Sequence, residues 1–171
     1  MVPTAYNLAQ ILSRAKYDLA INCGVAGSFI RDIKIGEVVY VAQDIFAELG
    51  AEDDEKFLTL SQLGLIGSDT FTPDAIKQYP VLNKLKKVKG ITVNTVHGNE
   101  NSIKKITDRL QPDIETMEGA AFYFVCESEK IPAIQLRGIS NYVEKRNREN
   151  WNMPLAVKSV SEVVKQFVHE I

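Results

Sequence analysis

The sequence predicts an α/β fold, in which helices pack on a largely parallel sheet. Short apolar runs rich in β-branched residues alternate with stretches of helical periodicity along the 171 residues. The run DLAINC at 18–23 stops at Gly24, and IPAIQLRGI at 131–139 is equally apolar, as expected for buried strands. No repeat or linker interrupts the pattern, so we expect residues 1–171 to form a single domain.

The other elements follow from the same periodicities. A small-residue turn, GVAGS, is expected at 24–28, and 47–62 should be a surface excursion. A strand with one polar face is expected at 36–46, and a second strand at 91–96. Helices are expected at 5–16, 72–87, 99–110 and 151–171, and another should follow Pro112-Asp113. In the last helix the expected core positions are Val157, Val160, Val164, Phe167 and Ile171.

Composition excludes several classes of partner. Hydrophobic residues make up 45% and charged residues 25%, and the net charge of -2 argues against nucleic acid or an anionic membrane surface. No apolar run reaches the roughly 18 residues of a membrane span, and no signal peptide is visible, so we expect a cytoplasmic protein. Cys23 and Cys126 should be buried free thiols. The only histidines are His97 and His169, so we expect no His-based metal site.

Small or polar residues follow three of the expected strands. They are GVAGS at 24–28, VHGN at 96–99 and SN at 140–141. Ligands of open α/β sheets bind at the carboxyl ends of strands, so these three segments can face one pocket. His97 either lines that pocket or simply occupies a turn. Arg137, inside an apolar strand, should pair internally or at an interface.

Glu118 is expected in the first turn of its helix, on the apolar face, with Asp113 or Thr116 as the cap. Two interpretations remain open at this point. Glu118 either completes a capping box or salt bridge, or accepts hydrogen bonds from vicinal sugar hydroxyls. The small residues at 119–121 would allow a ligand to approach closely. Asn141 has a similar pair of interpretations, an Asx turn or a donor and acceptor for a ligand.

Four segments together resemble the purine nucleoside phosphorylase and nucleosidase superfamily, and within it the futalosine hydrolases most closely. They are INCGVAGS, ETMEGAAFYFVC, RGISNYVE and RNRENWNMPLA. The resemblance covers nearly the whole chain. It implies a three-layer α/β/α sandwich around a mixed, twisted sheet, and usually a homodimer. It also implies cleavage of a ribose–purine N-glycosidic bond without a metal or organic cofactor.

The resemblance also implies roles for individual residues. Met117 and Glu118, with Thr116 beside them, would lie against the ribose. Val25, Ala26 and Gly27 would line the region of the sugar and the attacking water, and Val96 and His97 would lie against the base. Asn141 would contact the purine ring. Adenine-releasing relatives carry Asp at that position, whereas the amide of Asn suits a 6-oxopurine such as hypoxanthine.

The implied reaction is hydrolysis of futalosine to hypoxanthine and dehypoxanthinyl futalosine, a step of menaquinone biosynthesis. Alternatives are a methylthioadenosine/S-adenosylhomocysteine nucleosidase, a phosphorylase, with Arg31 as its one obvious phosphate ligand, or a catalytically dead purine-binding module. The family's water-activating acid follows its first strand. The resemblance therefore implies that this chain lacks the family's opening strands and that acid, for which Glu144 is a substitute by residue type only.

Overall fold

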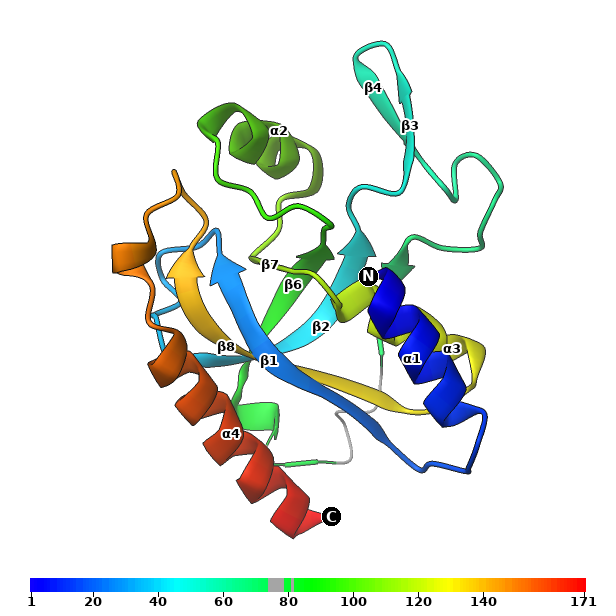
Figure 1. Cartoon of the computed structure of the whole chain (residues 1–171), viewed down its shortest axis with the longest axis vertical. Coiled ribbons are helices and arrows are strands. Elements are labelled where there is room, and N and C mark those ends of the chain that lie inside the picture. Colours follow the sequence, from blue (N-terminus) through cyan, green and yellow to red (C-terminus); the bar gives the residue numbers. More distant parts are fainter. Residues whose placement is uncertain (74–78, 81) are drawn as a thin grey trace.

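The computed structural model describes residues 1–73, 79–80 and 82–171, and a twisted mixed sheet lies at its centre (Figure 1). The strand order of this sheet is β5-β2-β6-β7-β1-β8. Its strands are β1 (Ala20–Ser28), β2 (Val38–Phe46), β5 (Thr70–Phe71), β6 (Lys86–Thr92), β7 (Ile114–Thr116) and β8 (Ala133–Tyr142). A separate hairpin is formed by β3 (Gly50–Asp53) and β4 (Lys56–Thr59), in the segment expected to be a surface excursion.

The sheet contains both parallel and antiparallel pairings. The pairs β1–β8, β2–β6 and β6–β7 are parallel, whereas β1–β7, β2–β5 and β2–β8 are antiparallel. The pairing of Val38–Tyr40 with Leu136–Gly138 brings β2 against β8, so the strong twist folds the sheet back on itself. The long pairings are parallel, as expected, and the short antiparallel ones make the sheet mixed, as the family resemblance implied.

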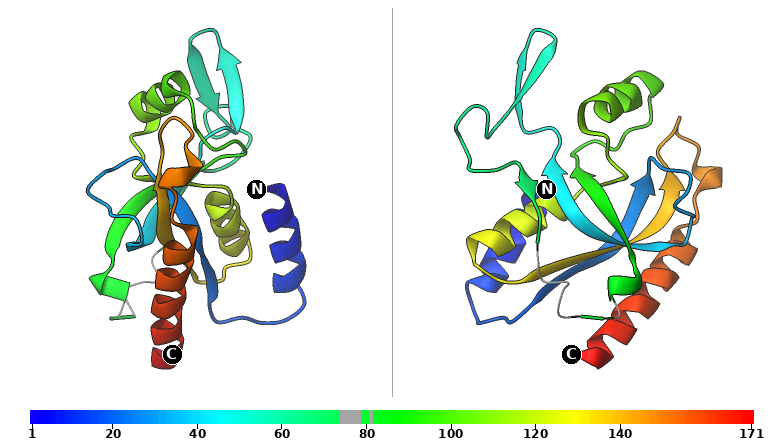
Figure 2. Two further views of the ribbon diagram at one scale, coloured as in Figure 1. Left: turned by 60° about the vertical axis from the view of Figure 1, so that its left-hand side comes forward. Right: turned by 180° about the vertical axis from the view of Figure 1, so that it is seen from behind.

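Helices cover both sides of the sheet. They are α1 (Val2–Leu12), α2 (Glu100–Leu110), α3 (Gly119–Ser128) and α4 (Met153–Glu170), with short 3₁₀ turns at Leu82–Lys84 and Arg148–Asn150. Helices α1 and α3 pack together on one side, and α4 lies on the other side along β1 and β8 (Figures 1 and 2). Asn99 caps α2 and Asn152 caps α4 through their side-chain oxygens, which fixes where both helices begin.

Several expected boundaries differ from the structure. GVAGS is the second half of β1 and not a turn, because its small residues pair with both neighbouring strands. The helix expected at 5–16 begins and ends earlier, and the strand expected at 91–96 is β6, which starts at Lys86. Of the helix expected at 72–87, positions 74–78 and 81 lie outside the described residues. Among the described positions, Leu82–Lys84 form a short 3₁₀ turn and Lys86 and Lys87 belong to β6, so the expectation was wrong there.

Expectations about burial were confirmed in part. In α4, Val160 and Phe167 are buried as expected and Val164 packs against the same core cluster, while Ala156 is a buried position that was not expected. Val157 and Ile171 are exposed. Cys126 is buried as expected, but Cys23 is exposed because the first half of β1 is only partly covered. No helix in the described part of the chain is long and apolar enough to cross a membrane.

Candidate functional site

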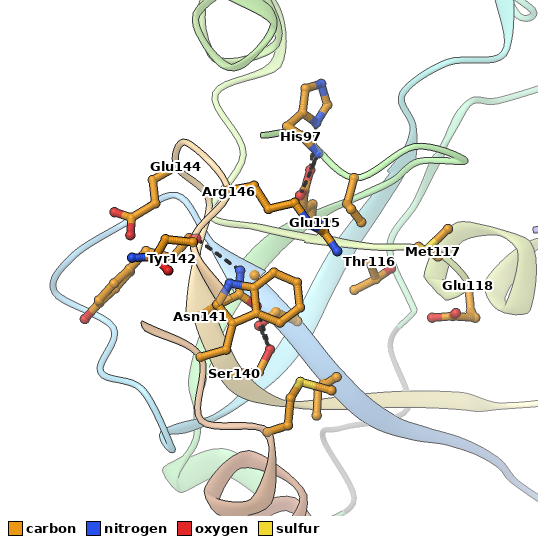
Figure 3. A pocket seen from close by; sticks show the side chains of 17 residues that line it. His97, Glu115, Thr116, Met117, Glu118, Ser140, Asn141, Tyr142, Glu144 and Arg146 are labelled. Carbon is orange, nitrogen blue, oxygen red and sulfur yellow. Dashed lines mark hydrogen bonds and ion pairs between the residues drawn. The ribbon is translucent and has the colours of Figure 1, made fainter. Parts of the chain in front are cut away.

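One pocket gathers the residues that the sequence and the family resemblance assigned to sugar and base binding. It encloses about 190 Å³ where β1, β7 and β8 end and α3 begins. The loop between β6 and α2 and the segment that follows β8 close its other sides (Figure 3). The predicted residues among its lining are Val25, Ala26, Gly27, Val96, His97, Thr116, Met117, Glu118 and Asn141. These residues come from four separate elements, so their meeting is a property of the fold.

Gly27 sets the geometry at the centre of the pocket. It lies opposite Glu115 in the antiparallel pairing with β7 and opposite Asn141 in the parallel pairing with β8. A Cβ at this position would lie 3.2 Å from the Asn141 Nδ2 atom and 3.7 Å from the Glu115 Cγ atom. The glycine therefore allows an amide and a carboxylate to stand close together at the floor of the pocket.

Glu118 is the N-cap residue of α3 and so lies just before the first turn in which it was expected, and its side chain makes no capping hydrogen bond. The first turn of α3 is held instead by Thr116, whose hydroxyl accepts from the Gly119 N–H at 3.2 Å. The carboxylate of Glu118 is half exposed to the pocket, and Arg137 Nη1 lies 3.8 Å from it. Within the first interpretation, the capping box was wrong and the salt bridge is present. The ion pair leaves the carboxylate accessible, and the second interpretation, binding of sugar hydroxyls, stays a prediction.

The small residues at the start of α3 do not face the pocket. Gly119, Ala120 and Ala121 are buried, and a Cβ on Gly119 would lie 2.0 Å from Asp44 Oδ2. The group that approaches them is an internal carboxylate and not a ligand. Asp44 lies on the strand expected to have one polar face, and that face points into the protein.

Asn141 is the penultimate residue of β8 and pairs with Gly27, so it lies within the strand and does not follow it. Its Oδ1 accepts a hydrogen bond from Ser140 Oγ at 2.7 Å, and its Nδ2 donates to the Tyr142 carbonyl at 3.0 Å. These bonds run to its two neighbours, so the side chain forms no Asx turn. One N–H and one lone pair of the amide stay available for a ligand.

Glu115 is a pocket residue that the sequence did not reveal. Its carboxylate is buried, accepts from the His97 backbone N–H at 3.0 Å, and lies 2.7 Å from the His97 Nδ1 atom. The His97 ring points away from Asn141 and packs edge-on against Phe29 (Figure 3). A helix capped by Asp113, one of the two expected caps, would have included Glu115. The β-branched residues Ile114 and Thr116 on either side of Glu115 were the available signal for a short strand.

The mouth of the pocket is held by an ion pair. Glu144 accepts from Arg31 and from Asn150, and the Arg31 guanidinium lies 4.3 Å from the centre of the Tyr142 ring. The hydrogen bond from Arg31 lowers the pKa of Glu144 below its usual range, which makes this carboxylate a weak proton acceptor. Arg31, the one obvious candidate for a phosphate ligand, is already engaged with Glu144.

The segment after Glu144 adds further lining residues whose roles we had not assigned. They are Arg146, Asn147, Trp151 and Met153. The Arg146 guanidinium lies 5.0 Å from the centre of the Trp151 ring, so the lining of the pocket includes a flat apolar surface and a cation in contact with it. Within the described residues, no cluster of three or more His, Cys, Asp or Glu side chains is arranged to hold a metal ion.

Comparison with curated proteins finds futalosine hydrolases among the relatives of this chain. The chain is 28% identical to futalosine hydrolase of Streptomyces coelicolor, over 86% of this chain and 64% of that protein. It is 25% identical to futalosine hydrolase of Thermus thermophilus, over 99% of this chain and 77% of that protein. The chain thus spans somewhat less than two thirds of the Streptomyces protein.

Comparison with solved structures and with family models agrees on the fold. Futalosine hydrolase of Helicobacter pylori superposes with a TM-score of 0.82 at 18% identity, over 99% of this chain and 76% of that one. A methylthioadenosine/S-adenosylhomocysteine nucleosidase of Colwellia psychrerythraea, in complex with adenine, gives 0.80 at 22% identity, over 98% and 73%. The model of the phosphorylase superfamily matches residues 1–169. The pocket described above therefore belongs to a member of the phosphorylase superfamily.

Proposed function

We propose that this protein hydrolyses the N-glycosidic bond of a purine nucleoside, and that its substrate is futalosine. The products would be hypoxanthine and dehypoxanthinyl futalosine, as in menaquinone biosynthesis. The observation that carries the proposal is that Glu118 and Asn141, which the sequence assigned to a sugar and a base, line a single pocket. The curated relatives named futalosine hydrolase support the choice of substrate.

Glu118 is the proposed ribose ligand. A carboxylate accepts two hydrogen bonds side by side, which suits the vicinal 2′- and 3′-hydroxyls of a ribose. Cleavage passes through a sugar with oxocarbenium character, so a nearby negative charge stabilises the transition state more than the ground state. Met117 and Thr116 would flank the sugar, and Val25, Ala26 and Gly27 would leave room for it and for the attacking water.

Asn141 is the proposed ligand of the departing base. Its amide can donate to N7 or O6 of hypoxanthine, where negative charge develops as the bond breaks. Glu115, on the other side of Gly27, can accept from the N1–H of a 6-oxopurine. Val96 and His97 would lie against the ring. Adenine carries an amino group in place of O6 and has no N1–H, so this set of groups fits it less well.

We also propose a homodimer. An apolar groove of about 250 Å³ lies between the start of α1, the middle of α3 and the β3–β4 region. Its lining includes Val2 and Phe124, which are exposed, and exposed apolar grooves of this kind often mark protein interfaces. Sedimentation of the protein and of Phe124→Glu tests this, with a dimer expected for the former and a monomer for the latter. The free thiols of Cys23 and Cys126 suit a cytoplasmic location, which is part of the same proposal.

The direct test measures base release from futalosine, inosine and 5′-methylthioadenosine, with and without inorganic phosphate. We expect hypoxanthine from futalosine at a rate independent of phosphate. Glu118→Gln should lower that rate at least about a hundredfold, whereas Glu162→Gln, the same change on the exposed face of α4, should not.

Each other outcome points to a different function. Adenine released from 5′-methylthioadenosine alone would identify an adenine-specific nucleosidase. A rate that requires phosphate would identify a phosphorylase. Hypoxanthine bound without turnover of any nucleoside would identify a purine-binding module, and absence of both binding and turnover would remove the purine assignment altogether.

A further inference from the structure

Four polar side chains form a cluster in the otherwise apolar interior beneath the start of α3. They are Asp44 of β2, Thr92 of β6, and Gln135 and Arg137 of β8, and all four are buried. Two of them carry charges when ionised. Burying such groups costs free energy that an apolar set of similar volume would not incur, so packing alone does not explain the cluster.

Hydrogen bonds link the cluster in one direction, from the core to the pocket. Gln135 Nε2 donates to Asp44 Oδ2 at 3.0 Å, and Arg137 Nε donates to Gln135 Oε1 at 2.9 Å. Arg137 Nη1 then lies 3.8 Å from Glu118 Oε2. This series of side-chain contacts therefore begins at Asp44 and ends at Glu118, the carboxylate proposed to bind ribose.

A second branch ties Asp44 to the backbone of α3. Thr92 Oγ1 donates to Asp44 Oδ1 at 2.9 Å and accepts from the Ala120 N–H at 2.6 Å. Gly119 fits closely over the cluster, since a Cβ there would lie 2.4 Å from Gln135 Oε1. Both branches thus converge on the residues directly after Glu118.

The carboxylate of Asp44 fixes the donor-to-acceptor direction of these hydrogen bonds. An ionised carboxylate only accepts, so the amide of Gln135 must turn its nitrogen to Asp44 and its oxygen to Arg137. With the opposite orientation, the nitrogen of Gln135 would face the Nε–H of Arg137, and two donors would oppose each other. The guanidinium would then lose the bond that holds it in the plane from which it reaches Glu118.

We propose that Asp44 and Gln135 are positioning residues that hold the Arg137 guanidinium against Glu118 and so orient the ribose-binding carboxylate. The proposal rests on the function proposed above, because the orientation of Glu118 matters to a ligand only if Glu118 binds the sugar. Neither Asp44 nor Gln135 lines the pocket, so neither touches the substrate.

Asp44→Asn is the decisive variant. It preserves size, removes a buried charge, and allows its new amide to donate to Gln135, which reverses the donor-to-acceptor direction of these hydrogen bonds. The matched control is Asp69→Asn, the same change at another buried aspartate, which is bonded to Ser61 and lies outside the pocket lining. Affinities are measured for hypoxanthine and for a non-hydrolysable C-nucleoside analogue of inosine, in which a carbon–carbon bond joins the base to the ribose.

For Asp44→Asn we expect affinity for the C-nucleoside to fall roughly tenfold, with hypoxanthine affinity unchanged within about twofold. Asp69→Asn should leave the ratio of the two affinities unchanged even if it lowers stability. A merely structural role of Asp44 would weaken both ligands alike or neither, and either result overturns the proposal.

A second measurement is independent of ligand binding. Hydrogen exchange of the Arg137 Nε–H is followed by NMR, the signal being identified by its loss in Arg137→Lys. Exchange should speed up at least about tenfold in Asp44→Asn and stay unchanged in Asp69→Asn. If the wild-type chain binds neither ligand, the proposed function fails, while this comparison still decides whether Asp44 positions Arg137. Unchanged exchange in Asp44→Asn overturns the positioning role.

Discussion

The Arg137 guanidinium lies 3.8 Å from the Glu118 carboxylate, and the two partners differ sharply in exposure, at 3% for Arg137 and 46% for Glu118. The cation belongs to the core and the anion to the pocket. Burial lowers the pKa of Arg137, and the negative charges of Glu118 and Asp44 oppose that effect. The ion pair therefore connects a buried residue of the sheet with the pocket in which we expect ribose to bind.

Replacing Arg137 by Met should destabilise the protein strongly. The change preserves an apolar stem but leaves the buried carboxylate of Asp44 without its nearby cation, a situation that typically costs about 3 kcal/mol of unfolding free energy. Urea denaturation measures the effect. Lys104→Met is the control, because it breaks the exposed ion pair with Asp108 and should cost less than about 1 kcal/mol. Equal losses in the two variants would show that Arg137 contributes no more than a surface cation.

Asn141→Asp should shift the preferred base from hypoxanthine towards adenine. The carboxylate loses the donor that serves O6 of hypoxanthine, and as an acceptor it suits the amino group of adenine. We expect the ratio of hypoxanthine to adenine release to fall at least about tenfold, measured on inosine and 5′-methylthioadenosine.

The control for this shift is Asn152→Asp. Asn152 accepts from the Leu155 N–H as the N-cap of α4, lies outside the pocket lining, and an aspartate there caps equally well. Its base preference should match that of the wild type. If Asn141→Asp left the ratio of hypoxanthine to adenine release unchanged, Asn141 would not determine which purine is bound.

Much of the fold, and about half of the residues that line the pocket, could be predicted from the sequence. Alternating apolar runs predicted the strands β1, β2 and β8, and helical spacing predicted α2 and α4, because each of these elements is long enough to show its period. The family motifs supplied Glu118 and Asn141. The three residues of β7 are too few to show a period, so no strand was expected at Glu115.

The buried cluster was beyond prediction for a different reason. Asp44 is bonded to side chains 48 and 91 residues away, so nothing in its local sequence shows that its partners exist. A polar residue on an apolar strand normally indicates a solvent-facing side, whereas Asp44 is fully buried. The partners meet only because β2, β6 and β8 come together around the start of α3.

Gly119→Ala tests how closely α3 fits over that cluster. The added methyl would lie 2.0 Å from Asp44 Oδ2 and 2.4 Å from Gln135 Oε1, so α3 or the cluster must shift. We expect a loss of about 1–3 kcal/mol in unfolding free energy. Gly67→Ala is the control, since its Cβ meets nothing within 4 Å, and it should change stability by less than about 0.5 kcal/mol. A neutral Gly119→Ala would imply that the start of α3 has more room than its contacts show.

Titration of Asp44 should also make the unfolding free energy depend on pH. Burial raises the pKa of Asp44 to about 6 from 3.8, and hydrogen bonds from Gln135 and Thr92 and the charge of Arg137 oppose this increase only in part. The folded state therefore binds a proton that the unfolded state has lost between these two values. Stability from this group is fully present below pH 3.8 and is lost as pH rises towards 6, by about 3 kcal/mol in total.

Asp44→Asn removes this titration. The unfolding free energy of the wild type minus that of Asp44→Asn should therefore fall as pH rises from about 4 to about 6 and stay level above that range. Urea denaturation of both proteins across this range measures the difference, and titrations common to both cancel. Parallel stability curves would show that Asp44 keeps an ordinary pKa in the folded protein. In that case the carboxylate is reached by water or is neutralised more completely by Arg137, and its burial beneath α3 costs little.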